Sequence, residues 1–267
     1  ESWEDYSRRA FAQMEEMLVR HAHETAAVIV EPLVQCAGGM RMYHPIYLKL
    51  LREACDRHGV HFIADEIAVG FGRTGRLFAC EWAGVAPDMI CLSKGLTGGT
   101  LPLAATLTTE AIYQAFHGDY REGRAFLHSH SYTGNPLACT AALATLDILE
   151  QRDWMAHNRG VGHLMYTAVQ ELMDHPHVAE VRQQGMILAI DLAQDGRALK
   201  PFAAEERRGL HVYRHGLKAA RSQTGVGAIL RPLGNTVYFM PPYVIEPEEI
   251  GHLARLAIAG IHSATAD

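Results

Sequence analysis

The chain has 267 residues, of which 48% are hydrophobic and 20% are charged, and its formal net charge is −6. This composition is typical of a globular protein with one large domain or two smaller ones. The negative charge disfavours nucleic acid as the main partner, because phosphate binding needs clustered Lys and Arg. No apolar run approaches the roughly 18 residues of a membrane span, so no membrane partner is expected. The five cysteines include no C-x-x-C pair, which predicts a reducing, cytoplasmic location.

The first part of the chain alternates helices with short apolar strands. The apolar spacing predicts helices over 4–22 and 45–58, and strands over 26–30, 60–64, 89–92 and 104–108. Pro45 suits the first turn of its helix, and Gly59 suits the residue that ends it. Continuous apolar strands that alternate with helices predict an α/β domain over residues 1–150, with a mostly parallel sheet covered on both faces.

The second part of the chain has a different mixture of predicted helices and strands. Asn135 and Pro136 are a favoured N-cap and first helical residue, so a helix is predicted from there to about residue 151. Further helices are predicted over 156–174, 204–219 and 246–263, and strands over 178–182, 186–192, 228–232 and 236–240. This mixture predicts a smaller α+β domain over residues 151–267.

Gly70, Gly72 and Gly75 form a G-x-G-x-x-G motif just after a predicted strand. A dinucleotide-binding turn needs the strand to run directly into the first glycine and a helix to begin at the last. Here Asp65 and Glu66 intervene, and Pro87 follows too soon for a crossover helix. The glycines are therefore expected to give a loop its positive φ angles.

Histidine pairs of the form H-x-H raise the question of a metal site. They are His21/His23, His128/His130 and His175/His177. On a strand, both side chains of such a pair face one side and could bind a metal. Since no further ligand lies at a recognisable spacing from any pair, surface or hydrogen-bonded histidines are expected and no metal is predicted.

Polar side chains stand at the ends of two neighbouring predicted strands. Asp65 follows one strand and Lys94 follows the next. Ligands of open parallel sheets bind at the carboxyl ends of the strands, so the two side chains should approach one crevice. A structural ion pair is one interpretation. The other is a pyridoxal phosphate site, which needs a lysine for the Schiff base and an acid beside the pyridinium nitrogen.

A phosphate group would also need hydrogen-bond donors. Ser129, Ser131 and Thr133 lie just ahead of the helix that begins at Asn135–Pro136. Hydroxyl groups beside a helix N-terminus can bind an anion. Simple capping of the helix explains the same residues equally well.

Five segments together resemble the class III, fold type I, pyridoxal-phosphate aminotransferases. They are EPLVQCAGGM (31–40), FIADEIAVGFGRTG (62–75), PDMICLSKGLTGG (87–99), HSHSYTGNPLACTAA (128–142) and LRPLGNTVYFMPPYVI (230–245). The resemblance implies a pyridoxal 5'-phosphate cofactor and the fold type I architecture, with part of a large domain followed by a small C-terminal domain. It also implies a homodimer with active sites at the subunit interface.

The resemblance assigns four residues to the cofactor. Lys94 is expected to be the catalytic Schiff-base lysine and the proton shuttle. Asp65 is expected to pair with the pyridine nitrogen and Ile67 to pack on the ring. Ser131 is expected to reach the cofactor phosphate of the neighbouring subunit.

Three further residues are assigned to substrate. Arg231 resembles the arginine that binds the carboxylate of the keto substrate, a task that suits the guanidinium fork. Arg73 and Tyr238 are expected to line the same pocket. For Arg73, a salt bridge that fixes the loop is an equally good explanation.

Within the class, the segments are most similar to the biotin-synthesis branch. That likeness implies transfer of an amino group from S-adenosylmethionine to 8-amino-7-oxononanoate. Many relatives have a glutamate that gates an arginine when glutamate is the donor, and this chain has Ala37 there. Cys36 and His130 also depart from the expected glycine and proline. A transaminase for another diamine or ω-amino acid remains an alternative.

The family's N-terminal part, with a glycine-serine phosphate cup and ring-stacking aromatic residues, has no counterpart in this sequence. The 267 residues therefore resemble a piece of a longer chain. A non-catalytic fragment or assembly module is the alternative from a different functional class.

Overall fold

The computed structural model describes residues 1–219 and 226–266, and the chain divides into two compact units. Unit 1 comprises Glu1–Leu33, Tyr43–Phe71 and Arg76–Asp153, and unit 2 comprises Val34–Met42, Gly72–Gly75 and Trp154–Asp267. Two short early segments thus belong with the C-terminal unit. The domains predicted from the sequence, 1–150 and 151–267, remain a prediction.

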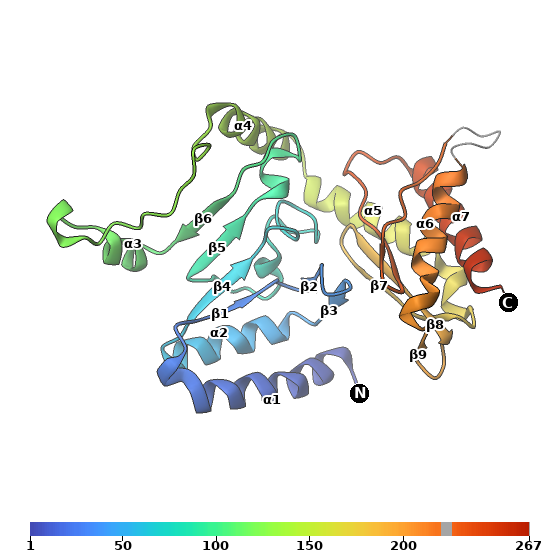
Figure 1. Ribbon diagram of the computed structural model, residues 1–267, viewed down its shortest axis with the longest axis horizontal. Helices are drawn as coiled ribbons and strands as arrows, with labels where there is room; N and C mark the ends of the chain where they lie inside the picture. Colours follow the sequence, from blue (N-terminus) through green and yellow to red (C-terminus); the bar gives the residue numbers. More distant parts are fainter. Residues whose placement is uncertain (220–225, 267) are drawn as a thin grey trace. The chain divides into compact units, whose positions relative to one another are not determined.

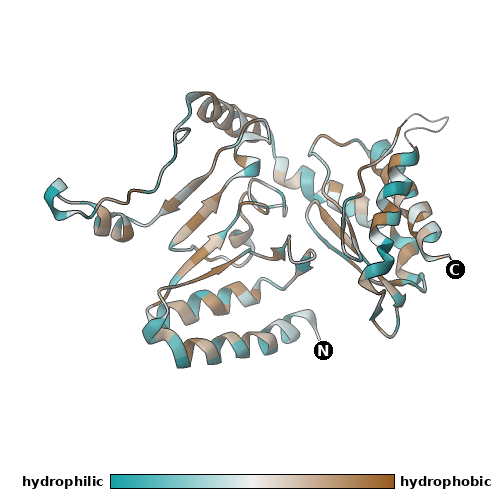
Figure 2. Cartoon of the chain, in the orientation of Figure 1, coloured by the Kyte–Doolittle hydropathy of each residue, from teal (hydrophilic) through white to brown (hydrophobic). Residues whose placement is uncertain are grey.

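Unit 1 is built on a four-stranded sheet with the order β1-β4-β5-β6. The strands are β1 (Ala27–Val30), β4 (His61–Asp65), β5 (Met89–Leu92) and β6 (Ala105–Thr108). β1 pairs with β4 and β4 with β5 in parallel, whereas β6 runs antiparallel to β5. The predicted mostly parallel sheet is present, and Figure 2 shows apolar residues concentrated in β4 and β5.

Two long helices support this sheet from one side (Figure 1). α2 (Ile46–His58) packs on β4, and α1 (Trp3–His21) packs on α2. α2 buries Leu48 and Leu51, and it ends at Gly59, whose φ of +66° is the left-handed geometry that favours glycine. The predicted end of this helix is confirmed, while Pro45 lies at its N-cap rather than inside its first turn.

Later elements of unit 1 are shorter. α3 (Glu110–Phe116) was not predicted, since seven residues carry little apolar periodicity. α4 (Pro136–Glu150) begins where predicted, with Pro136 in its first turn and the Asn135 side chain as its cap. The 3₁₀ helices of unit 1 are η1 (Ala22–Glu24), η2 (Ala79–Trp82), η3 (Lys94–Thr97) and η4 (Tyr120–Glu122).

A charged pair ties α2 to the sheet. The Arg52 guanidinium lies 2.7 Å from the Asp88 carboxylate and 2.6 Å from that of Asp56, and Asp88 also accepts the Phe62 N–H at 2.7 Å. Burial alone would raise the pKa of Asp88, but the hydrogen bonds from Phe62 and Arg52 lower it on balance. The ionised form of Asp88 is therefore the one that the fold stabilises.

The Asp88→Asn variant is expected to unfold about 2 kcal/mol more easily at neutral pH, because Arg52 loses its better-buried partner. A carboxyl group with a lowered folded pKa stabilises above its unfolded pKa, and this stabilisation disappears as pH falls through the folded pKa. The two proteins should therefore converge in urea unfolding as pH falls below about 4. Asp56→Asn is the matched control: the Asp56 side chain is 66% exposed, so its loss should cost less than about 1 kcal/mol.

Unit 2 contains an antiparallel sheet with the order β10-β11-β8-β7, and β9 pairs with β8. The strands are β7 (Val178–Gln184), β8 (Ile187–Asp195), β9 (Lys200–Pro201), β10 (Pro232–Leu233) and β11 (Thr236–Phe239). The helices are α5 (Trp154–Ala168), α6 (Arg208–Ala219) and α7 (Pro247–Thr265), with 3₁₀ helices η5 (Gln170–Asp174) and η6 (Ala204–Glu206). Leu188, Ile190 and Val237 are fully buried in the core between sheet and helices.

Some boundaries in this unit differ from the prediction. The helix predicted over 156–174 ends at Ala168 and continues as a 3₁₀ turn, and α6 begins at Arg208 rather than at residue 204. The strand predicted over 228–232 is present only as β10. The hairpin of β2 (Val34–Gln35) and β3 (Arg41–Met42) was not predicted, because strands of two residues have no alternation to read.

Among the described residues, none of the helices combines the length and the apolar character that crossing a membrane requires.

Candidate active site

Asp65 and Lys94 stand at the same end of two adjacent parallel strands in unit 1. Asp65 is the last residue of β4 and pairs with Cys91 of β5. Lys94 lies two residues after the end of β5 and opens η3, with Ser93 between them as the N-cap. The parallel pairing fixes both side chains at the carboxyl edge of the sheet, where α/β proteins bind their ligands.

Asp65 is held in a defined orientation by the turn that follows it. Its Oδ1 accepts the Ile67 N–H at 3.1 Å, and the side chains of both residues are half-buried. The second carboxylate oxygen of Asp65 has no hydrogen bond within the described part of the chain. It is thus available to a ligand, and Ile67 lies beside it as a neighbouring apolar group.

Lys94 has an unusual backbone and a free side chain. Its φ is +43°, an uncommon conformation for a residue with a side chain and one that is often found at functional sites. The next residue, Gly95, lies so close to Phe71 that an added Cβ would meet the Phe71 ring at 3.1 Å. The Lys94 side chain is exposed and forms no hydrogen bond or ion pair with any described residue.

Glu66, next to Asp65, has a structural role that the sequence did not reveal. It is fully buried and accepts the backbone N–H groups of Ala79 and Cys80, both at 2.9 Å. Burial raises the pKa of Glu66, and these two hydrogen bonds oppose the rise. Only the first carboxylate of the Asp65–Glu66 pair is therefore open to a ligand, while the second anchors η2.

Ser131 lies in an exposed turn ahead of α4. His130 closes this turn, because its ring Nδ1 accepts the Tyr132 N–H at 3.1 Å and its own N–H donates to Thr133 at 3.0 Å. The Asn135 side chain caps α4, as the capping interpretation predicts. The Ser131 hydroxyl has no partner among the described residues, so its assignment to a cofactor phosphate stays a prediction.

The last two glycines of the G-x-G-x-x-G motif lie in a loop of unit 2, whereas Gly70 belongs to unit 1. Gly72 and Gly75 have φ angles of +96° and +87°, as predicted for a loop that needs positive φ. The Asn158 side chain donates to the Gly72 carbonyl at 3.0 Å and Arg159 donates to that of Gly75 at 2.7 Å. A side chain at Gly185 would collide with the backbone of the same loop. The N–H groups of Gly70 and Gly75 donate to the carbonyls of Glu66 and Gly72 at 2.9 and 3.0 Å, so these two donors are also engaged within the protein.

Arg73, inside this loop, is fixed by two contacts. It donates to the Pro241 carbonyl at 2.6 Å, and its guanidinium carbon lies 4.7 Å from the centre of the Tyr243 ring. Burial lowers the pKa of Arg73. The partners that hold Arg73 are thus a carbonyl and an aromatic ring, and the described residues show no salt bridge to it. Its assignment to the substrate pocket stays a prediction.

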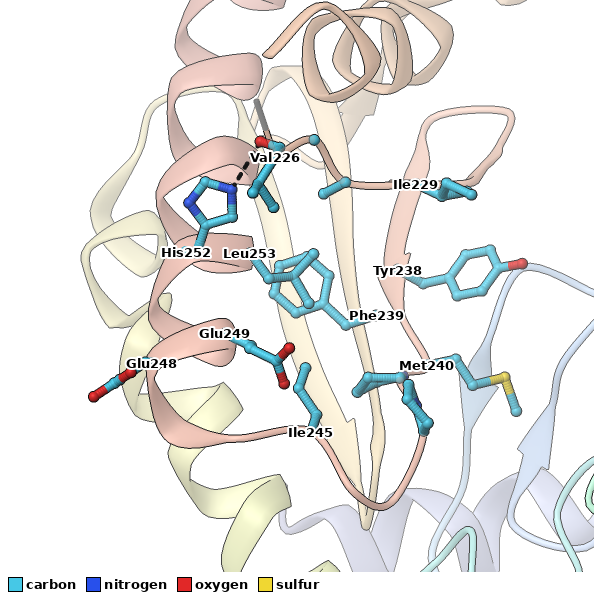
Figure 3. Close-up of a pocket in the computed structure, with 14 residues that line it drawn as sticks. Val226, Ile229, Tyr238, Phe239, Met240, Ile245, Glu248, Glu249, His252 and Leu253 are labelled. Carbon is cyan, nitrogen blue, oxygen red and sulfur yellow. Dashed lines mark hydrogen bonds between the residues drawn. The ribbon is translucent and has the colours of Figure 1, made fainter. Parts of the chain in front are cut away.

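Tyr238 lies on β11, and Arg231 immediately precedes β10. The two strands pair antiparallel, with Pro232 opposite Val237. Arg231 is exposed and Tyr238 half-buried. Tyr238 lines a cavity of about 670 Å³ between β11, the segment before β10 and the start of α7. Figure 3 shows Phe239 directed toward Leu253 of α7 and Tyr238 directed the other way.

The predicted site residues therefore divide between the units. Asp65, Ile67, Lys94 and Ser131 belong to unit 1, and Arg73, Arg231 and Tyr238 belong to unit 2. Within the described residues, no group of three or more His, Cys, Asp or Glu side chains is arranged to bind a metal.

The residues of unit 1 fit pyridoxal phosphate. A carboxylate with one free oxygen and an unpaired primary amine stand at adjacent strand ends. These are the groups that a pyridinium nitrogen and an aldehyde carbon require.

Comparison with known proteins gives a consistent identification. The family model "Aminotransferase class-III" matches residues 1–258. The adenosylmethionine-8-amino-7-oxononanoate aminotransferase of Nitratidesulfovibrio vulgaris is 46% identical over 258 residues, covering 96% of this chain and 46% of that protein.

Two solved structures match at a TM-score of 0.89. The adenosylmethionine-8-amino-7-oxononanoate aminotransferase of Methanocaldococcus jannaschii is 36% identical, with coverage of 96% of this chain and 58% of that one. An amine transaminase from an uncultivated Pseudomonas species, in a PLP-bound form, is 34% identical, with coverage of 98% and 58%.

The chain spans about half the length of the curated relatives it matches. The fold type I architecture predicted from the sequence is confirmed by these matches. The cofactor prediction is confirmed as well, since pyridoxal phosphate serves this family and is bound in the Pseudomonas neighbour. The chain belongs to the class-III aminotransferase family.

Proposed function

We propose that the protein carrying this chain is a pyridoxal-phosphate-dependent aminotransferase of biotin biosynthesis. It moves an amino group from S-adenosylmethionine to 8-amino-7-oxononanoate and so forms 7,8-diaminononanoate. The observation that carries the proposal is the placement of Asp65 and Lys94 at the carboxyl ends of β4 and β5. The names of the relatives support the choice of substrates.

Each residue of unit 1 has a defined task in this chemistry. Bound pyridoxal phosphate supplies an electron sink for the carbon that exchanges its amino group. The Asp65 carboxylate holds a proton on the ring nitrogen, and the Ile67 N–H keeps that carboxylate in place. Lys94 Nζ holds the cofactor and carries a proton between two carbon positions, which requires the free side chain described above. Ile67 packs on the cofactor ring, and Ser131 binds the phosphate of the cofactor that is held by the neighbouring subunit.

The residues of unit 2 bind the substrates. Arg231 takes the carboxylate of the keto substrate in a two-point ion pair, since its exposed guanidinium is available to a ligand. Tyr238 of β11 is assigned to the substrate pocket as well, and Arg73 contributes a wall fixed by Pro241 and Tyr243. Ala37 supplies no carboxylate where many relatives have glutamate, which favours a donor other than glutamate. The enzyme works in the cytoplasm as a homodimer.

Donor selection tests this proposal. The protein carrying this chain is incubated with pyridoxal phosphate, 8-amino-7-oxononanoate and one donor at a time: S-adenosylmethionine, lysine or glutamate. S-adenosylmethionine is expected to give turnover at least about tenfold above the other two, a difference of about 1.4 kcal/mol in transition-state binding. Diaminononanoate is measured by mass spectrometry.

Two other outcomes would redirect the assignment. Preference for lysine or glutamate would indicate a class III transaminase for another diamine or ω-amino acid. A folded protein that gives no change of visible absorbance with pyridoxal phosphate would indicate a non-catalytic fragment.

A further inference from the structure

The strained step of the β2–β3 hairpin in unit 2 is the pair of consecutive residues Gly39 and Met40, both with positive φ. Gly39 has a φ of +99° and Met40 has a φ of +54°. Glycine adopts this region freely, but methionine does not, so the conformation of Met40 must be imposed by its surroundings. The Met40 N–H donates to the Cys36 carbonyl at 3.1 Å, and the Met40 side chain is buried at 3% exposure. Ala37 is inside the turn that this hydrogen bond closes.

Arg182 of β7 binds both carbonyl groups of the strained step. Its Nε donates to the Met40 carbonyl at 2.8 Å and one terminal nitrogen donates to that of Gly39 at 2.7 Å. The remaining donors reach both carboxylate oxygens of Asp191, at 2.6 and 3.1 Å, and Glu180 at 3.0 Å. All five N–H groups of this guanidinium therefore have partners, and its side chain is 10% exposed.

Asp191, the carboxylate partner of Arg182, is itself held by a further hydrogen bond. Asp191 of β8 also accepts the hydroxyl of Thr236 of β11 at 2.7 Å. Three neighbouring strands of the sheet, β7, β8 and β11, thus contribute side chains to a connected network. Such a network holds a side chain in one rotamer, because every alternative leaves a buried polar group without a partner.

The turn lies beside residues that the proposed function assigns to substrate. The Cys36 thiol is close enough to Arg73 to affect the pKa of that guanidinium. Gly39 lies against Thr236, at 3.9 Å from a Cβ built on the glycine, and Thr236 is two residues before Tyr238 on β11. The turn, Arg73 and Tyr238 are therefore neighbours within unit 2.

We propose that Arg182 is a positioning residue that holds the turn Gln35–Met40 in its strained conformation, so that the turn forms a fixed, uncharged wall for substrate binding. This role rests on the proposed aminotransferase function. It predicts that the planar fork of Arg182 is needed, and not its charge alone, because a lysine has three N–H donors where Arg182 uses five in a fixed geometry.

The test compares Arg182→Lys with Glu180→Gln in the protein carrying this chain. Glu180 is the partner of Arg182 with a 59% exposed side chain, so its neutral variant leaves the carbonyl bonds intact and serves as the matched control. Hydrogen–deuterium exchange is followed for the amide of Met40. Steady-state kinetics give KM and kcat for the amino acceptor.

Arg182→Lys is expected to speed exchange at Met40 by about tenfold or more, because the turn opens without its clamp. KM for the amino acceptor should rise by roughly tenfold while kcat changes less than about threefold, the pattern of lost substrate binding. Glu180→Gln should leave both measurements as in the wild type. If exchange at Met40 is unchanged in Arg182→Lys, the proposal that Arg182 holds the turn is wrong. Faster exchange with an unchanged KM overturns the role in substrate binding.

The exchange measurement does not depend on turnover. If the wild-type protein lacks transaminase activity, the proposed function fails, whereas exchange at Met40 still decides whether Arg182 holds the turn.

Discussion

Replacing Lys94 by alanine is expected to lower turnover by roughly 10⁴-fold or more, the upper range for loss of a group that transfers protons. The physical reason is that Lys94 is the free primary amine at the carboxyl end of β5, the strand that pairs with the end of β4 at Asp65. The variant should also lose the change of visible absorbance that the wild type gives with pyridoxal phosphate. Spectroscopic titration and an end-point assay measure both effects.

Lys49→Ala is the control for this experiment. Lys49 is an exposed lysine on α2, so its loss should leave the absorbance change and the turnover as they are. After borohydride reduction, peptide mapping should find the pyridoxyl group on Lys94 alone. Turnover retained in Lys94→Ala would refute the assignment of this lysine.

Replacing Asp65 by asparagine is expected to lower kcat by roughly 10²- to 10³-fold, the usual cost of removing one preorganised electrostatic group. The asparagine side chain has nearly the same shape, and its oxygen can still accept the Ile67 N–H that Asp65 accepts at 3.1 Å. The local turn should therefore survive, and only the negative charge beside the ring nitrogen is lost. Pyridoxal phosphate should still bind, so cofactor titration and kcat must be measured together.

Asp147→Asn on the exposed side of α4 is the matched control and should leave kcat unchanged. A wild-type kcat in Asp65→Asn would show that this carboxylate does not act on the cofactor. Loss of folding in the variant, seen by circular dichroism, would mean that Asp65 is needed for structure.

Much of the site of unit 1 could be predicted because it depends on local signals. Apolar runs marked β4 and β5, and parallel strands place their carboxyl ends at one edge, so Asp65 and Lys94 could be paired in advance. The N-cap at Asn135 and the positive φ at Gly59 follow from single residues and their neighbours.

The roles of the polar residues that hold the site in place could not be predicted in this way. Glu66 looks like Asp65 in sequence, and only packing against η2 shows that it is buried and bound to two backbone N–H groups. Arg182 gives no local sign of its partners, since the carbonyls it binds lie more than 140 residues earlier in the chain.

The sequence by itself thus determined the longer helices and strands in order, the strand ends that carry Asp65 and Lys94, and the family. The tertiary structure alone decided that the segments 34–42 and 72–75 belong with the C-terminal unit, and that Arg73 is held by a carbonyl and an aromatic ring. The physical reason is the distance along the chain over which each kind of interaction acts. Propensity, capping and periodicity act over a few residues, whereas the burial and pairing of a polar side chain depend on groups that only the folded chain brings together.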